Sequence, residues 1–405
     1  MGRKSVHYRS ARRIAPLARP RGHSGDRTRP KVVHVIVAGD IGGAERLLVD
    51  LASRPEQSGA DHCVALMTPN PQLREMIRAA GVTIRDRGPV RENPLAYLWR
   101  SFGPADVAWL EQILTDEGAS VVHVHTFGSH ILGVRAALRR NVPVLRTEHG
   151  LHHYLDLSCS FFRQWALQKT DCVVAVSDYV GRFVERKAPY ARHKLRVIRN
   201  GVDATYFHPE EPPREGPFTF ALVCRLEPWK RVDLVIGAVA RVPHILLRIA
   251  GSGSARRKLQ ALARDLRVDD RICFLGYRPD PRPVIAESHA AINSSRDEPL
   301  GLSVLEAFAM QRPVVAFAGG GIPEIVQDGR TGWLVHENSV EALAARLFEA
   351  SANRQRAATL GANARAFIDR ECRIEDMCRG YARAYSELHG TASSGSLTQD
   401  IARRK

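Results

Sequence analysis

Two glutamates in the second half of the chain are spaced to organise an elongated anionic ligand. Glu298 and Glu306 lie eight positions apart, with Pro299-Leu300-Gly301 between them. If this run opens a helix, its free backbone N–H groups and the positive end of the helix dipole face an anion. Eight residues of helix span about 12 Å, so the two carboxylates must hold different parts of the ligand. This geometry favours a nucleotide-sugar over a metal ion.

Two cations upstream extend this interpretation. Arg225 and Lys230 follow an apolar, strand-like run and lie in a loop that contains Pro228. Two fixed cations there would bind a diphosphate and stabilise the charge that grows on it as its bond to a sugar breaks. Without further context, a solvated basic loop beside Arg231 is the default alternative.

Glycine-rich turns follow two other expected strands. Gly42 and Gly43 lie where glycine lets backbone amides approach a phosphate or sugar closely, and the alternative is a tight strand-to-helix turn. Gly251 and Gly253 stand in a similar place in the second half. Glu45, early in the helix after the first turn, either complements the helix dipole or contacts an acceptor.

Histidines lie near two more strand ends. His123 and His125 flank Val124, and His149 follows the next strand. We interpret His123 and His125 as pointing to opposite faces of the strand, so that only one of them would face a cleft. The alternative for each histidine is a hydrogen-bonded core residue.

Strands that alternate with helices must position these residues. Short loops between them predict parallel sheets covered on both faces, and ligands of such sheets bind outside the carboxyl ends of the strands. The fold class is therefore α/β, with two Rossmann-like doubly wound domains facing a central cleft. The expected strands span 32–37, 63–67, 121–124, 142–145, 172–176, 195–198, 218–223, 245–250, 272–274, 290–293, 313–316 and 332–335.

The 405 residues exceed the size at which one core keeps growing, which favours two domains. We expect, in order, a disordered basic tail (1–30), an N-terminal Rossmann-like domain (31–205), a linker (206–217), a C-terminal Rossmann-like domain (218–370), a C-terminal helix (371–390) and a frayed tail (391–405).

Charge and cysteine content bear on partners and location. The net charge is +16, and residues 1–30 hold nine Lys/Arg against one Asp. This tail reads as a solvated extension, or alternatively as a peripheral contact with anionic lipid on the inner face of the cytoplasmic membrane. Nucleic acid is not an expected partner, because no aromatic-basic platform or reading motif is present. No run approaches the ~18 apolar residues of a membrane span, and seven scattered cysteines are typical of a reduced cytoplasmic protein.

Taken in order, these motifs resemble the retaining glycosyltransferases of the GT-B fold, specifically family 4 (glycosyl transferases group 1), over roughly residues 31–385. The resemblance implies that Arg225 and Lys230 bind the diphosphate, Glu298 meets the transferred sugar and Glu306 accepts hydrogen bonds from the ribose. One departure is Leu300, where the family usually has phenylalanine. The resemblance also implies that His125 lies at the sugar and that Gly42, Gly43, Gly251, Gly253, Gly301 and Leu302 bind the donor, and we expect Glu45 and His149 on the acceptor side.

The implied reaction moves a hexosyl unit from a nucleotide-sugar to a hydroxyl of a glycolipid or oligosaccharide acceptor in cell-surface polysaccharide or glycolipid synthesis, with retention of anomeric configuration. Family frequency favours a UDP-sugar. Neither a metal nor another cofactor is expected, since the chain has no Asp-x-Asp triplet. The alternatives are a nucleotide-sugar epimerase or hydrolase on the same fold, and a non-catalytic nucleotide-sugar-binding protein.

Overall fold

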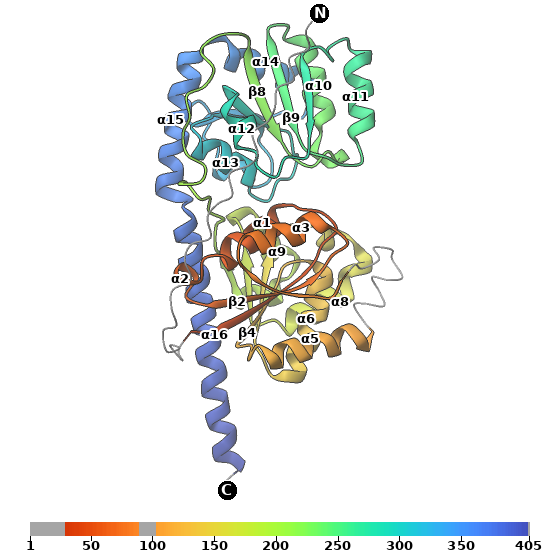
Figure 1. Ribbon diagram of the computed structural model, residues 1–405, viewed down its shortest axis with the longest axis vertical. Coiled ribbons are helices and arrows are strands. Elements are labelled where there is room, and N and C mark those ends of the chain that lie inside the picture. Colours follow the sequence, from red (N-terminus) through yellow and green to blue (C-terminus); the bar gives the residue numbers. More distant parts are fainter. Residues whose placement is uncertain (1–28, 89–102, 404–405) are drawn as a thin grey trace, which may run out of the picture.

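The computed structural model describes residues 29–88 and 103–403, which form two α/β domains (Figure 1). The predicted basic tail therefore lies almost entirely outside the described residues. In Figure 1 the N-terminal domain runs from red to yellow below the C-terminal domain, which runs from green to blue.

The N-terminal domain is built on a seven-stranded parallel sheet with the order β3-β2-β1-β4-β5-β6-β7. Most of its strands are continuous apolar runs, because helices cover both faces. The order reverses between β1 and β4, where a crevice opens at the carboxyl ends of the strands. The strands are β1 (Lys31–Val37), β2 (Asp61–Met67), β3 (Thr83–Asp86), β4 (Val121–Val124), β5 (Val144–Glu148), β6 (Cys172–Ala175) and β7 (Leu195–Val197).

The C-terminal domain is built on a six-stranded parallel sheet with the order β10-β9-β8-β11-β12-β13. Its order reverses between β8 and β11, so each domain has its own switch point at which a ligand can bind. The strands are β8 (Phe218–Val223), β9 (Ile245–Ala250), β10 (Ile272–Gly276), β11 (Ala290–Asn293), β12 (Val314–Phe317) and β13 (Gly332–Val335).

Helices connect the strands in both domains. In the N-terminal half they are α1 (Gly43–Ala52), α2 (Pro55–Ser58), α3 (Pro71–Ala79), α5 (Pro104–Asp116), α6 (Phe127–Arg140), α7 (His152–Leu155), η1 (Leu157–Cys159), α8 (Ser160–Gln168), α9 (Asp178–Lys187) and η2 (Pro189–Lys194). In the C-terminal half they are η3 (Pro228–Lys230), α10 (Val232–Arg241), α11 (Arg256–Asp265), α12 (Arg282–Ala286), α13 (Leu302–Ala309), η4 (Ile322–Glu324), α14 (Val340–Ala352), α15 (Arg354–Glu371) and α16 (Ile374–Arg403).

The last helix returns from the second domain to the first. Figure 1 shows α16 running beside the N-terminal domain and projecting past it. Its buried Tyr381 and Tyr385 pack into the same core as β6 and α9. The helix runs to Arg403 and so includes most of the residues for which we expect a frayed tail. Extending an existing helix adds one hydrogen bond for each residue fixed.

β3 and β5 differ most from the predicted strands, for physical reasons. β3 is not among the predicted strands, because Ile84 is the only strongly apolar residue of its four. β5 extends three residues past the predicted 142–145, through Arg146 and Glu148. These two charged side chains are buried because they pair with each other at 2.8 Å between Arg146 Nη2 and Glu148 Oε2. Such pairing is invisible to a hydrophobicity pattern.

Hydrogen bonds from α9 hold the two domains together near the cleft. The N-cap residue Ser177 donates to the Pro299 carbonyl at 2.6 Å. The Glu324 carboxylate accepts from the N–H groups of Asp178 and Tyr179 at 3.0 and 2.5 Å. The Glu324 carboxylate thus neutralises the positive end of α9 from the opposite domain.

Candidate active site

The two domains enclose a cleft of about 1070 Å³ at the carboxyl ends of their strands. Its size suits a ligand larger than a single sugar. The structure brings all the residues predicted for the site onto its lining: Gly42, Gly43, Glu45, His125, His149, Arg225, Lys230, Gly251, Gly253, Glu298, Gly301, Leu302 and Glu306. No described residue of the predicted set lies elsewhere.

The C-terminal wall carries an ion pair at its centre. Lys230 Nζ donates to Glu298 Oε2 at 2.6 Å, and both side chains are less than one-fifth exposed. Burial alone would raise the pKa of Glu298, but the Lys230 charge and hydrogen bonds from Lys230, Ser295 and Asn293 lower it below its usual value. Glu298 is therefore a carboxylate that holds Lys230 at the cleft.

Arg225 reaches across the cleft towards the opposite domain. Its guanidinium lies 5.8 Å from the centre of the Trp229 ring, a cation–π contact that orients it. A Cβ added to Gly42 would lie 3.9 Å from Arg225 Cζ, so the guanidinium faces the first glycine turn. An anion at this point would meet Arg225 together with the backbone of the N-terminal turn.

Glu306 has a different environment from Glu298. It lies in the first turns of α13 and is 7% exposed. Burial raises its pKa, and Arg46, whose Nη1 lies 3.5 Å from Glu306 Oε1, opposes the rise. Because Arg46 belongs to α1, this contact joins the two walls. Hydrogen-bond donors of a ligand would stabilise the Glu306 carboxylate in the same way.

At some of the glycine positions, close contacts within the protein leave no room for a larger residue. A Cβ at Gly251 would lie 1.8 Å from the Cys224 carbonyl oxygen, so two loops of the C-terminal wall could not pack with any larger residue there. A Cβ at Gly43 would lie 3.3 Å from Leu302 Cδ1, where the two walls meet. Leu300, at the position where phenylalanine was expected, is buried in the core under α13.

The N-terminal wall begins with a self-contained turn. The Gly42 N–H donates to Glu45 Oε2 at 2.7 Å, so Glu45 caps the start of its own helix. Burial raises the pKa of Glu45, while hydrogen bonds from the backbone and the charge of Arg225 oppose the rise. Of the two roles expected for Glu45, interaction with the start of its own helix thus accounts for one of its two carboxylate oxygens.

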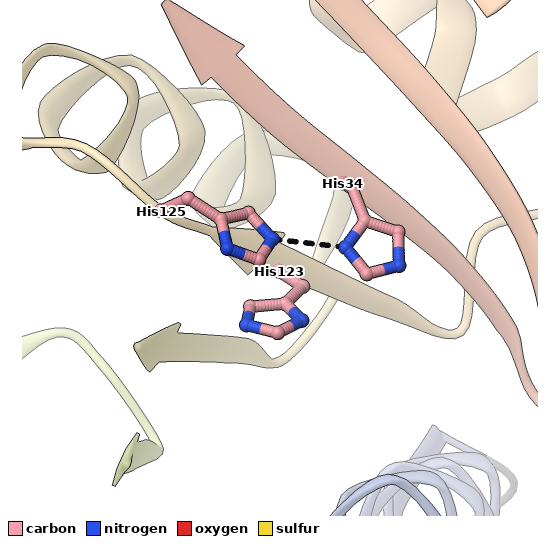
Figure 2. Close-up of side chains that lie close together, drawn as sticks. All are labelled: His34, His123 and His125. Carbon is pink, nitrogen blue, oxygen red and sulfur yellow. Dashed lines mark hydrogen bonds between the residues drawn. The ribbon is translucent and has the colours of Figure 1, made fainter. Parts of the chain in front are cut away.

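The histidines of this wall form a buried cluster (Figure 2). The His123 and His125 rings lie on the same side of the strand, with centroids 4.0 Å apart. The expectation of opposite faces was wrong, because side chains two residues apart in a strand share a face. Only His125 reaches the cleft, since it follows the end of β4 while His123 lies within the strand.

His34, His123 and His125 bring ring nitrogens within 4.8 Å of one another, as a metal site would require. Each of their six nitrogens already has a protein partner. His34 bonds to His125 and His62, His125 also bonds to His149, and His123 bonds to Tyr385 and Thr147. A metal would have to displace hydrogen bonds of all three rings, so the hydrogen-bonded network is the better interpretation.

Residues that the sequence analysis did not select also line the cleft or support it. Arg46 and Trp229 face the cavity. Behind it, His34 and His62 support His125, and a polar residue in the middle of an apolar strand was the one available signal for His34.

Comparisons with known proteins agree with this geometry. A family model described as Glycosyltransferase Family 4 matches residues 41–206, and one described as Glycosyl transferases group 1 matches residues 203–367. Alpha-maltose-1-phosphate synthase of Mycolicibacterium smegmatis is 31% identical over 274 residues, which cover 60% of this chain and 71% of that protein. This chain belongs to the family 4 glycosyltransferases.

Two more similarities fit this assignment. The putative colanic acid biosynthesis glycosyltransferase WcaL of Salmonella typhimurium is 31% identical over 241 residues, 54% of this chain and 59% of that one. The crystal structure of HepE from Anabaena, in complex with UDP and glucose, matches with a TM-score of 0.76 at 21% identity, over 88% of this chain and 100% of that one. The glycosyltransferase is thus an enzyme of the hexosyltransferase class with a GT-B fold, as its sequence predicted. No helix within residues 29–88 or 103–403 is long and apolar enough to cross a membrane.

Proposed function

We propose that this glycosyltransferase moves a hexosyl unit from a nucleotide-sugar, with UDP as the favoured nucleotide, to a hydroxyl of a glycolipid or oligosaccharide in cell-surface polysaccharide or glycolipid synthesis. The observation that carries the proposal is the convergence of Arg225, Lys230, Glu298 and Glu306 on one wall of the cleft. The UDP preference is supported by the UDP and glucose named for the HepE structure, and the acceptor class by the colanic acid biosynthesis named for WcaL.

In the proposed mechanism, Arg225 and Lys230 bind the diphosphate and stabilise the charge that develops on it as the glycosidic bond breaks. Glu298 holds Lys230 in place and meets the transferred sugar, and Glu306 accepts hydrogen bonds from the ribose. The acceptor hydroxyl attacks the anomeric carbon from the face that the diphosphate leaves, and a departing phosphate oxygen takes the hydroxyl proton. The configuration is therefore retained. Fixed cations and the N–H groups that open α13 supply the positive charge, so we propose that no metal is required.

An assay of product formation distinguishes this function from its alternatives. The purified enzyme is incubated with UDP-glucose, UDP-galactose, UDP-N-acetylglucosamine or GDP-mannose, with and without an oligosaccharide or glycolipid acceptor, and products are resolved by mass spectrometry and anomeric NMR. We expect nucleoside diphosphate and an α-linked product that depend on the acceptor. A new nucleotide-sugar or free sugar formed equally well without acceptor would favour an epimerase or hydrolase, and nucleotide-sugar binding without turnover would favour the non-catalytic alternative.

In this proposal, the choice of a glycolipid acceptor also implies contact with a membrane. A glycolipid acceptor would bring the enzyme to the inner face of the cytoplasmic membrane, and the basic residues before residue 30 would favour an anionic surface. Sedimentation with vesicles of phosphatidylglycerol, compared between the full chain and a variant that lacks residues 1–28, tests this part. Equal sedimentation of both would contradict a role for the basic tail.

A further inference from the structure

A line of hydrogen-bonded histidines runs from the cleft into the core of the N-terminal domain. His149 Nε2 lies 3.2 Å from His125 Nδ1, and His125 Nε2 lies 2.9 Å from His34 Nδ1, the bond drawn in Figure 2. The line continues from His34 Nε2 to His62 Nδ1 at 2.8 Å and ends at Ser58, whose Oγ lies 2.7 Å from His62 Nε2. We call these four rings and the Ser58 hydroxyl the histidine chain.

The four rings come from four neighbouring strands. His62 and His34 lie in β2 and β1, and His125 and His149 follow β4 and β5, which are consecutive in the sheet. The line of rings therefore runs across the strands, and the sheet fixes the position of each ring. A change of hydrogen position at one end must pass through every ring to reach the other.

Burial keeps the histidine chain uncharged. It lowers the pKa of His62 to about 3, with a contribution from the charge of Lys31, and that of His149 to about 3, with a contribution from Arg146. It also lowers the pKa of His34 and His125 well below the usual value. A neutral imidazole has one N–H donor and one bare acceptor nitrogen.

One donor in each ring means that all bonds of the histidine chain must run in the same direction. Ser58 has a single hydroxyl hydrogen, which it donates to the Arg54 carbonyl at 2.9 Å. The Ser58 oxygen is then free to accept from the Nε2–H of His62. His62 Nδ1 accepts in turn from His34 Nε2–H, and the same order puts the hydrogen on Nε2 of His125 and His149.

The direction of these hydrogen bonds decides which histidine nitrogen is without hydrogen at the cleft. Both ring nitrogens of His125 are occupied by His34 and His149, so His125 has no nitrogen left for a ligand. His149 lines the cleft, its Nε2 is bonded to His125, and its Nδ1 makes no hydrogen bond within the described parts of the chain. The one bare nitrogen that the histidine chain turns towards a substrate is therefore His149 Nδ1.

We propose that His149 Nδ1 accepts a hydrogen bond from the hydroxyl group that receives the sugar, and that Ser58, His62 and His34 are positioning residues that keep this nitrogen free of hydrogen. The proposal rests on the proposed function for the identity of the hydroxyl. In the bound state the hydroxyl donates its single hydrogen to His149 Nδ1, with its lone pairs directed at the anomeric carbon. As the glycosidic bond breaks, this hydrogen bond passes from Nδ1 to the departing phosphate oxygen, which takes the proton while the hydroxyl oxygen bonds to the anomeric carbon. No charge is created on the histidine chain during transfer.

Replacing Ser58 tests the direction of the histidine chain from its far end. In Ser58→Ala, His62 Nε2–H has no acceptor, so we expect the chain to reverse and His149 to carry its hydrogen on Nδ1. Long-range ¹⁵N–¹H spectra of protein labelled on histidine distinguish bare from hydrogen-bearing nitrogens, and a His149→Phe variant assigns the His149 signals. A wild type with hydrogen on His149 Nδ1, or an unchanged His149 in Ser58→Ala, would overturn the proposal.

Ser288→Ala is the matched control. Ser288 is equally buried and donates to the carbonyl four residues before it at 2.9 Å, but in the C-terminal domain. We expect it to leave the His149 spectrum as in wild type. Ser58→Thr, which keeps the hydroxyl, should do the same, whereas a merely structural role for Ser58 would not link the His149 hydrogen to this hydroxyl.

A kinetic readout joins the histidine chain to the reaction. Water serves as the acceptor probe, and the rate of hydrolysis of the nucleotide-sugar that wild type cleaves is measured with the dissociation constant of its nucleoside diphosphate. We expect Ser58→Ala to lower the hydrolysis rate about tenfold, the effect of one neutral hydrogen bond, and to leave the dissociation constant unchanged. Equal rates in Ser58→Ala and Ser288→Ala would overturn the role of His149. If wild type released nucleoside diphosphate neither with water nor with the acceptors of the product assay, the proposed function would fail, while the spectra would still decide the direction of the histidine chain.

Discussion

The two walls of the cleft are built on similar sheets, but they differ in how far they rely on charged groups. The C-terminal wall presents charges, with Lys230 paired to Glu298 and Arg225 directed across the cleft. The N-terminal wall also carries the charged Arg46, but it adds a row of neutral groups, because burial holds its histidines uncharged and each bonds to the next. Charges suit a diphosphate, whereas directional neutral groups suit a hydroxyl. The difference indicates that binding the leaving group and placing the acceptor are divided between the domains.

We expect the largest effect from removing the central cation of the C-terminal wall. Lys230→Ala leaves the Glu298 carboxylate without its partner and takes positive charge from the site of the departing diphosphate. Transfer should fall by about 10²- to 10³-fold, the usual cost of one electrostatic group at a transition state. Steady-state rates of nucleoside diphosphate release measure this, with exposed Lys258→Ala on α11 as the control. Wild-type activity in Lys230→Ala would remove the C-terminal wall from the mechanism.

Acid should weaken the N-terminal wall before the C-terminal one. Between pH 3 and 6.5 the folded protein binds fewer protons than the unfolded chain at His62 and His149, so stability falls as pH is lowered through this range and is unaffected above it. From pH 7.5 to 5.5 the two histidines together should lower the free energy of unfolding by about 2.7 kcal/mol. Denaturant titrations at both pH values measure this.

His62→Gln sharpens the same test. Glutamine keeps hydrogen-bonding groups but does not titrate, so the loss of stability between the two pH values should shrink by about 1.4 kcal/mol, the share of one histidine. A stability that does not change between pH 7.5 and 5.5 in the wild type would contradict the account of a neutral, buried wall.

Glycine requirements should also differ between the walls. Gly251→Ala places a Cβ against the Cys224 carbonyl, and the forced shift should destabilise the protein by about 2 kcal/mol. Gly150→Ala, on the N-terminal wall, meets nothing within 4 Å and should change stability by less than about 0.5 kcal/mol. Equal unfolding midpoints for the two variants would show that the packed loops of the C-terminal wall can relax.

A smaller effect is expected from two glutamates that line opposite walls of the cleft, Glu306 and Glu45. Glu306→Gln keeps the shape of the side chain but weakens it as an acceptor, and nucleoside diphosphate should bind about tenfold more weakly if Glu306 holds the ribose. Glu45→Gln on the opposite wall should leave that affinity unchanged, because the Glu45 carboxylate is occupied by the Gly42 N–H. Isothermal titration of both variants compares them, and an equal loss in each would remove the distinction between the walls.

The sequence predicted the C-terminal wall more completely than the N-terminal one. Residues such as Arg225, Lys230, Glu298 and Gly251 follow strands whose apolar runs are unmistakable, and five of the six C-terminal strands were predicted within one residue at each end. The N-terminal wall depends on contacts between distant segments. His34 and His62 lie inside strands, and their partners are set by strand order, which a single sequence does not state.

Two wrong expectations, the end of β5 and the faces of two histidines, both concern buried polar groups. Arg146 and Glu148 extend β5 because each satisfies the other, and the two histidines of β4 and its end share a face that we assigned to opposite sides. The pairing that makes burial of Arg146 and Glu148 tolerable depended on the fold. The shared face of the two histidines follows from the two-residue period of a strand and was predictable from the sequence.

The most direct test of the account is the binding of nucleoside diphosphates to the C-terminal wall without metal. The melting temperatures of wild type and Lys230→Ala are measured in EDTA against UDP, GDP, ADP and TDP. A ligand at ~100 times its dissociation constant should stabilise the wild type by about 2.7 kcal/mol. We expect a selective increase with one of them, UDP first, that is lost or strongly reduced in Lys230→Ala. No increase with any nucleotide, or the same increase in both proteins, would contradict the central claim that these charges hold the donor diphosphate.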